Sequence, residues 1–122
     1  MQRFTDLKVW QRSQALTLQI YRASAAFPAQ ERFGLTSQLR RAAVSVPANI
    51  AEGSKRDSRT DYARFLNIAE GSLAEAECLL LLARDLGYLP AEVCEPLARE
   101  ADEIARMLHA LRTKVSDQGG SR

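Results

Sequence analysis

The sequence has few of the residues that build metal sites, disulfide frameworks or membrane spans. It contains two cysteines, one histidine and 7% aromatic residues in 122 positions. A structural zinc site needs about four nitrogen or sulfur ligands, and Cys78, Cys94 and His109 have no CxxC or HxxxH spacing. The longest apolar run, 78–83, is far shorter than the roughly 20 residues of a membrane helix. We therefore expect reduced core thiols, no metal or other cofactor, and no membrane partner.

Catalytic constellations are missing as well. A di-iron helical bundle needs a glutamate three residues before a histidine, and the residue at that position before His109 is Arg106. No serine has a credible histidine or lysine base nearby in the sequence, and no glycine-rich phosphate-binding motif occurs. We therefore expect that the protein is not an enzyme. Residues 1–6 contain no apolar stretch of the secretory kind, so we expect a cytoplasmic location.

Apolar residues recur at intervals of three and four along nearly the whole chain, which is typical of amphipathic helices. No segment alternates with a period of two, so no strand is expected. The first predicted helix is 7–27, with Asp6 as N-cap and Pro28 as stop, and the second is 35–53, kinked or split at Pro47. The third is 60–86, closed by Gly87. The last begins near Pro90 and runs to about 115, and Pro96 sets 91–95 apart as a short turn. Short loops between helices predict an all-α, antiparallel, up-down-up-down four-helix bundle at 1–116, followed by a disordered tail at 117–122.

One hexapeptide, Asn-Ile-Ala-Glu-Gly-Ser, occurs twice, at 49–54 and at 67–72. Two copies with unrelated flanks do not make a repeat protein. Small residues on a helix let two backbones approach closely, and this is the interpretation that we favour. A glycine inside a helix costs about 1 kcal/mol relative to alanine, so the sequence predicts that another helix packs tightly against Gly71.

Two features predict an oligomer of unspecified subunit number: the four leucines 79–82, and Ala42, Ala43, Val44 and Val46, which widen the apolar face of the second predicted helix. Leu79–Leu82 are consecutive, and at about 100° per residue they point around most of the helix. Some of them must lie outside the core of one bundle. There they either form a contact with another subunit or are scattered surface leucines, which is the alternative. Arg40 and Arg41 lie beside alanines and valines, and a partly buried arginine needs a carboxylate partner. We expect ion pairs within or between subunits with Glu52, Glu70, Glu75 or Glu77. Nucleic-acid contact is the less favoured alternative. The candidate interface or ion-pair residues are Arg40, Arg41, Glu52, Glu75, Leu80 and Leu81.

The formal net charge is only +2, but the charges are unevenly distributed. In the predicted bundle, one end gathers ten basic and five acidic residues, a net charge of +5, and the remainder carries −3. A basic rim of this kind attracts phosphate backbones without reading sequence; a solvated loop is the alternative. Tyr62 and Phe65 could stack on bases, but their helical spacing favours the core. The candidate nucleic-acid-binding residues are Lys55, Arg56, Arg59 and Arg64, with Arg3, Lys8 and Arg12 beside them.

Several segments also carry a family resemblance. They include Asp-Leu-Lys-Val-Trp at 6–10, Phe-Gly-Leu at 33–35 and the block from Gln38 to Gly53 with its Arg-Arg-Ala and Asn-Ile-Ala-Glu-Gly sequences. Together they resemble the bacterial four-helix-bundle proteins named after intervening sequences in large-subunit ribosomal RNA genes. The resemblance implies a barrel-like homopentamer. It also implies kinship with the accessory variability proteins of diversity-generating retroelements, which are basic, bind nucleic acid and partner a reverse transcriptase.

Two functional hypotheses follow. The first is a non-enzymatic, cytoplasmic, homo-oligomeric scaffold that binds the backbone of RNA or DNA through its basic rim. The second is a protein–protein adaptor that docks a reverse transcriptase or another protein partner and needs no nucleic acid.

Overall fold

The structure, a computed structural model, describes residues 3–120, with side chains through residue 117. This part of the chain contains four α-helices and no strand, as the sequence predicts. The elements are the short 3₁₀ turn η1 (Phe4–Asp6), α1 (Lys8–Ser24), the 3₁₀ turn η2 (Ala29–Glu31), α2 (Leu35–Ser54), α3 (Arg59–Asp85) and α4 (Ala91–Gly120).

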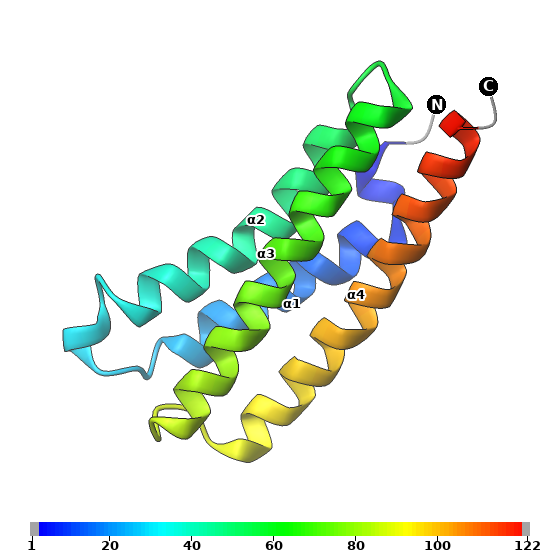
Figure 1. Ribbon diagram of the computed structural model, residues 1–122. Helices are drawn as coiled ribbons and strands as arrows, with labels where there is room; N and C mark the ends of the chain where they lie inside the picture. The colour runs from blue at the N-terminus through cyan, green and yellow to red at the C-terminus, as the bar shows by residue number, and fades with distance from the viewer. Residues whose placement is uncertain (1–2, 121–122) are drawn as a thin grey trace.

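The four helices lie side by side (Figure 1), with α1 and α3 each packed against α2 and α4. The turn between α2 and α3 lies at the end of the molecule that also holds the start of α1 and the end of α4. The loops 25–34 and 86–90 lie at the opposite end. No helix within residues 3–120 is long and apolar enough to cross a membrane.

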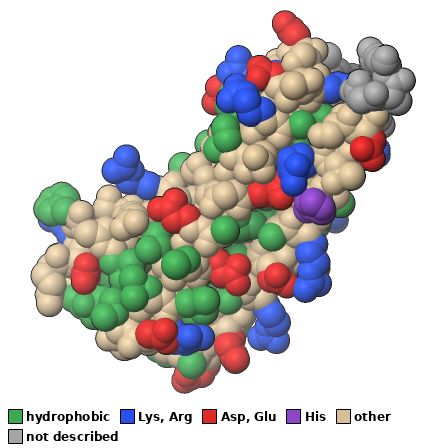
Figure 2. Space-filling view, viewed as in Figure 1, with side chains coloured by type: hydrophobic (Ala, Val, Ile, Leu, Met, Phe, Trp, Pro, Cys, Tyr) green, Lys and Arg blue, Asp and Glu red, His purple; other side chains and the backbone are tan. Residues whose placement is uncertain are grey.

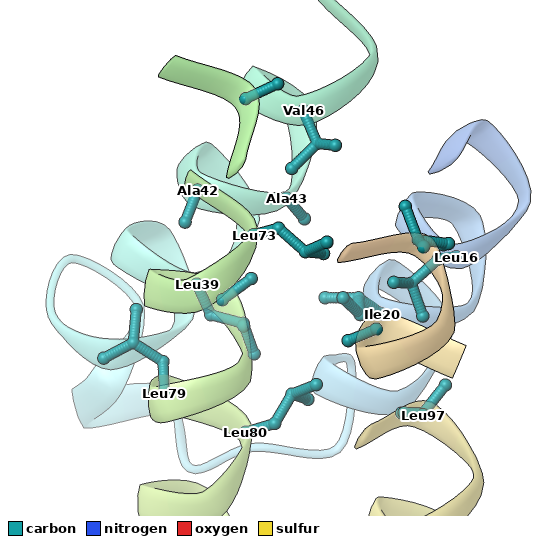
Figure 3. Close-up of a cluster of buried hydrophobic side chains, with 14 of the residues drawn as sticks. Leu16, Ile20, Leu39, Ala42, Ala43, Val46, Leu73, Leu79, Leu80 and Leu97 are labelled. Carbon is teal, nitrogen blue, oxygen red and sulfur yellow. The ribbon is translucent and has the colours of Figure 1, made fainter. Parts of the chain in front are cut away.

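The core lies between the helix pairs α2–α3 and α1–α4 (Figure 3). Its side chains recur at three- and four-residue spacing on each helix because only one stripe of a helix can face the centre of a bundle. Ile20, Leu39, Ile50, Leu66 and Ile104 are fully buried. Within residues 3–117, no buried polar side-chain atom lacks a hydrogen-bond partner.

The predicted stop of the third helix is confirmed. Gly87 has a φ of 82°, a left-handed conformation that glycine adopts without a Cβ clash. The Tyr88 N–H donates to the carbonyl of Ala83 at 2.9 Å, and the Gly87 N–H donates to the carbonyl of Arg84 at 3.0 Å. These two bonds form a Schellman motif and satisfy carbonyls that the end of a helix leaves free.

Two expectations about helix starts are wrong. Asp6 is not the N-cap of α1: it ends η1, where its carboxylate accepts the Arg3 N–H at 3.3 Å, and Leu7 is the capping residue. Residues 91–95 do not form a separate turn either, because α4 runs through Pro96 without a break. Pro96 frees only the carbonyl of Glu92, an exposed residue in the first turn where solvent is available. At its other end α4 extends to Gly120 instead of stopping near 115, and residues 121–122 of the expected tail lie outside the described residues.

Pro47 does not split α2, which is a single helix from Leu35 to Ser54. A proline has no N–H for the carbonyl four residues earlier, here that of Ala43. The Thr17 hydroxyl of α1 lies 3.1 Å from the Ala43 carbonyl and 2.9 Å from the Ser13 carbonyl of its own helix, so its single proton is shared between the two acceptors. A side chain from the neighbouring helix therefore offers the freed carbonyl part of a hydrogen bond, and α2 continues through the proline.

Candidate functional site

Lys55, Arg56, Arg59 and Arg64 lie at and just after the turn between α2 and α3, and all four are exposed. We call this group the basic turn. Figure 2 shows that basic side chains at this end of the molecule are interleaved with acidic ones. The turn is shaped by Ser58, whose hydroxyl accepts the Asp61 N–H at 3.0 Å and so caps α3.

The arginines of the basic turn are held in place by neighbours. Arg56 pairs with Glu52 at 2.5 Å, and Arg64 pairs with Asp61 at 3.0 Å. Both guanidinium carbons lie over the Phe65 ring, 4.8 Å and 4.5 Å from its centre. Phe65 therefore orients two cations at the surface while its own ring is buried.

The turn is tight because α2 and α3 approach closely at Gly53. A Cβ atom on Gly53 would lie 2.7 Å from Phe65 Cβ and 3.1 Å from Tyr62 Cδ1. Phe65 is buried and Tyr62 packs against the core, so the prediction that these rings serve packing is confirmed. Burial also raises the pKa of the Tyr62 phenol.

The other three predicted phosphate contacts lie on η1 and α1. Arg3 and Lys8 are exposed near the start of α1. Arg12 is different, because its guanidinium binds Glu100 through two hydrogen bonds of 2.6 and 2.9 Å and Glu103 through one of 3.2 Å. These bonds, chiefly those with Glu100, raise the pKa of Arg12. Arg12 thus links α1 to α4, and we leave it out of the candidate nucleic-acid surface.

Arg112, another cation of the predicted basic end, also forms an ion pair between two helices of the bundle. Arg112 of α4 donates to both carboxylate oxygens of Glu70 on α3, one of them at 3.5 Å. The His109 ring lies 3.7 Å from the same carboxylate. Glu70 was one of four carboxylates expected as partners for Arg40 and Arg41. In the described chain it pairs with Arg112 instead, which depends on how α3 packs against α4 and is not visible in local spacing.

The candidate interface residues separate into different environments. The guanidinium of half-buried Arg40 donates to the Ser24 hydroxyl at 2.9 Å and the Tyr21 carbonyl at 3.0 Å, and lies over the Tyr21 ring. The side chain is thus satisfied by α1 instead of by the expected carboxylate. Leu80 is 1% exposed in the core of its own bundle, so the prediction that it lies at an interface is wrong. Leu81 is half-buried.

Two more predictions need correction. Gly71 is exposed, and a Cβ atom there would meet nothing within 4 Å, so no helix of this chain packs tightly against it. Cys94 is buried and donates to the Leu80 carbonyl at 3.6 Å, as expected of a core thiol, but Cys78 is exposed. Within residues 3–117, no group of three or more histidine, cysteine, aspartate or glutamate side chains could hold a metal ion.

Arg41 and Glu75 share a surface groove of about 530 Å³ between α2 and α3. In its lining the hydroxyls of Ser45 and Ser72 are hydrogen-bonded at 2.8 Å, which links α2 to α3. This groove was not predicted from the sequence. Ser72 belongs to the second copy of the repeated hexapeptide, and this repeat was the sequence signal that could have indicated the groove. The groove is lined by Phe33, Gly34, Ser37, Gln38, Arg41, Ala42, Ser45, Ser72 and Glu75.

These observations define a class: an all-α protein of four packed helices, with a basic turn at one end and a polar groove along one helix pair. The comparisons with known proteins are more specific. The chain belongs to the 23S rRNA-intervening sequence protein family, which matches residues 5–110. It is similar to the crystal structure of a protein with unknown function from the S23 ribosomal protein family of Bacteroides thetaiotaomicron. The two are 28% identical, with a TM-score of 0.77 over 85% of this chain and 97% of that chain. No curated protein matches this chain.

Proposed function

We propose that this protein is a non-enzymatic, cytoplasmic scaffold that assembles as a homo-oligomer and binds the backbone of RNA or DNA through the basic turn. In this proposal the bundle is antiparallel, with up-down-up-down order, and the family resemblance makes a pentamer the expected assembly. The observation that carries the proposal is the gathering of Lys55, Arg56, Arg59 and Arg64 at one end of the molecule. The family's name, which refers to an intervening sequence of 23S rRNA, agrees with a nucleic-acid partner.

The ion pairs of the basic turn do not prevent phosphate binding. Exposed ion pairs are worth only about 0–1 kcal/mol, and an arginine can form two parallel hydrogen bonds with a phosphate. Because Arg56 and Arg64 already lie over the Phe65 ring, their donors need little further ordering. Arg3 and Lys8 would be flanking contacts. An oligomer would repeat the basic turn in every subunit, and each phosphate contact adds to the salt dependence of binding.

A binding experiment over a series of salt concentrations tests this proposal. Labelled RNA and DNA of mixed sequence should bind at low salt and dissociate as salt rises, with little preference for sequence. The charge reversals Lys55→Glu and Arg59→Glu should together weaken binding at least tenfold. The matched control, Arg99→Glu with Arg106→Glu on α4, makes the same change in net charge and should weaken binding much less. Absence of binding at low salt, or equal effects of the two double variants, would contradict the proposal.

The carboxylates of the basic turn supply a second test with the opposite sign. The variant Glu52→Gln with Asp61→Asn removes the competitors that pair with Arg56 and Arg64. It should therefore strengthen nucleic-acid binding severalfold, and the gain should shrink as salt rises. Unchanged or weaker binding would show that these arginines do not contact the backbone.

The groove between α2 and α3 favours a second candidate function, a protein–protein adaptor. Its polar lining places Arg41 and Glu75 on the surface, where they could pair with charges of a reverse transcriptase or another partner. Co-purification with the products of adjacent genes, compared between the wild type and Arg41→Glu, tests this function. A complex that forms equally well with the variant would contradict the adaptor role of the groove.

A further inference from the structure

Phe33 is the most exposed large apolar side chain of the described residues. Its side chain is 89% exposed, against 39–50% for the other exposed large apolar residues. It lies in the loop between η2 and α2, which projects from the bundle (Figure 1). Hydrophobic atoms stand at the tip of this projection in Figure 2. The Arg32 guanidinium carbon lies 5.3 Å from the centre of the Phe33 ring. An aromatic ring of this size left in water is typical of a contact residue.

The loop that carries Phe33 is fastened by one carboxylate. Glu31 Oε1 accepts the Leu35 N–H at 3.2 Å, which ties the loop to the start of α2. Glu31 Oε2 accepts the Tyr88 hydroxyl at 3.0 Å, which ties it to the loop between α3 and α4. Tyr88 also packs against the Phe27 ring, 5.9 Å between centres. Because the loop is already ordered, docking of Phe33 would cost little conformational entropy.

A mostly apolar groove of about 380 Å³ lies between the last turns of α1 and the first turns of α4. Val93 contributes an apolar side chain that is 42% exposed. The groove lies near the loops 25–34 and 86–90, at the same end of the bundle as Phe33. We call it the α1–α4 groove; it is lined by Gln19, Arg22, Ala23, Val93, Pro96 and Leu97.

We propose that Phe33 of one copy of the chain packs into the α1–α4 groove of the next copy. This inference rests on the proposed homo-oligomer and identifies the surfaces that join its subunits. Ring and groove lie at the same level along the bundle, so neighbouring copies can meet with their axes side by side. Arg32 lies beside Phe33, and exposed Glu92 lies one helical turn before the groove residue Pro96, so these opposite charges can pair as Phe33 docks. Arg22 lines the groove on the α1 side, so the pairing requires Arg32 to approach along α4.

The contact joins two different surfaces, because Phe33 belongs to the loop before α2 and the groove belongs to α1 and α4. Contacts between unlike surfaces run head to tail, and they close into a ring when the rotation between neighbours allows it. Each copy then offers one ring and one groove. This arrangement keeps the basic turn, at the opposite end of the bundle, free for nucleic acid.

The molar mass in solution, measured by light scattering and sedimentation over a range of concentrations, tests the contact. Phe33→Glu and Val93→Glu should each weaken subunit association roughly 30-fold or more, because each removes one apolar partner and adds a charge. Both residues are exposed, so circular dichroism and thermal melting should show a folded bundle. An equimolar mixture of the two variants should form one-to-one pairs, since it combines an intact Phe33 with an intact groove.

Leu82→Glu is the matched control. Leu82 is 45% exposed on α3, outside the α1–α4 groove, and the substitution introduces the same charge; the variant should keep the wild-type mass. A wild type that is monomeric at all concentrations would overturn the homo-oligomer itself. A wild-type oligomer that Phe33→Glu and Val93→Glu leave intact, or a mixture that stays monomeric, would overturn this contact alone. Loss of assembly in Leu82→Glu but not in Phe33→Glu would assign the interface to α3 instead.

Discussion

The two copies of the repeated hexapeptide should respond in opposite ways to the same substitution. Gly53 and Gly71 are both helical and are both preceded by Asn-Ile-Ala-Glu. Gly53 is buried, and a Cβ atom there would lie 2.7 Å from Phe65 Cβ. Gly71 is exposed, with nothing within 4 Å of such an atom. Glycine to alanine at each position therefore compares one local sequence in two tertiary environments.

The expected magnitudes follow from two terms. Alanine in place of glycine inside a helix gains about 1 kcal/mol. At Gly71 this term acts alone, so Gly71→Ala should raise the free energy of unfolding by up to about 1 kcal/mol. At Gly53 the added methyl group must push apart two packed helices, and overpacking of this kind costs about 1–3 kcal/mol. Gly53→Ala should therefore be neutral to destabilising by about 2 kcal/mol, and the two variants should differ by about 1–3 kcal/mol.

Urea denaturation followed by circular dichroism measures both values, with the slope of the transition as a check on two-state unfolding. The protein concentration should be varied, since association would add to the apparent stability. Equal stabilisation by both substitutions would refute the argument that α2 and α3 meet closely at Gly53. Destabilisation by Gly71→Ala that grows with protein concentration would show instead that a neighbouring subunit covers Gly71.

Three further predictions concern contacts between elements. The Ala43 carbonyl has no backbone donor because of Pro47, and Thr17→Val also removes the Thr17 hydroxyl beside it. This variant should lower the free energy of unfolding by about 1–3 kcal/mol in urea; an unchanged transition would contradict this role. A double-mutant cycle with Arg12→Met and Glu100→Gln should give a coupling of about 1 kcal/mol that falls with added salt, and zero coupling at low salt would contradict it. The hydrogen bond with Glu31 raises the pKa of the Tyr88 phenol above its ordinary value of 10.0. Since this pKa is higher in the folded state, the stabilisation is complete below about pH 10 and is lost as the pH rises through the folded-state pKa. Stability of the wild type should therefore fall more steeply above pH 10 than that of Tyr88→Phe, and parallel pH profiles would contradict this.

The positions of the helices could be predicted closely because the signals are local. Apolar spacing shows which residues share a helix face, and Gly87 supplies the left-handed residue that ends α3. The effects of Pro47 and Pro96 on their helices were not predicted correctly, because they depend on whether another group or solvent satisfies the carbonyl that each proline frees. Pro47 lies inside a continuous helix, and the Ala43 carbonyl that it frees is within hydrogen-bond distance of the Thr17 hydroxyl on a different helix.

The candidate site could be predicted only in part. The basic turn was visible because Lys55, Arg56 and Arg59 are neighbours in the sequence. The use of Arg12 and Arg112 as links to carboxylates on other helices was not visible, because those partners are distant along the chain. The same reason explains Leu80: four consecutive leucines show that some must face outward, but only the packing shows that Leu80 faces inward.

By itself the sequence determined that the chain is helical, roughly where each helix begins and ends, and that one turn is rich in basic residues. These properties follow from hydrogen bonds and side-chain spacing within a few residues. Only the tertiary structure decided which of two identical hexapeptides holds a closely packed glycine, which arginines stay at the surface and which apolar side chains remain in water. Those properties depend on the distance between atoms of different helices, and that distance is fixed only when all four helices share one core.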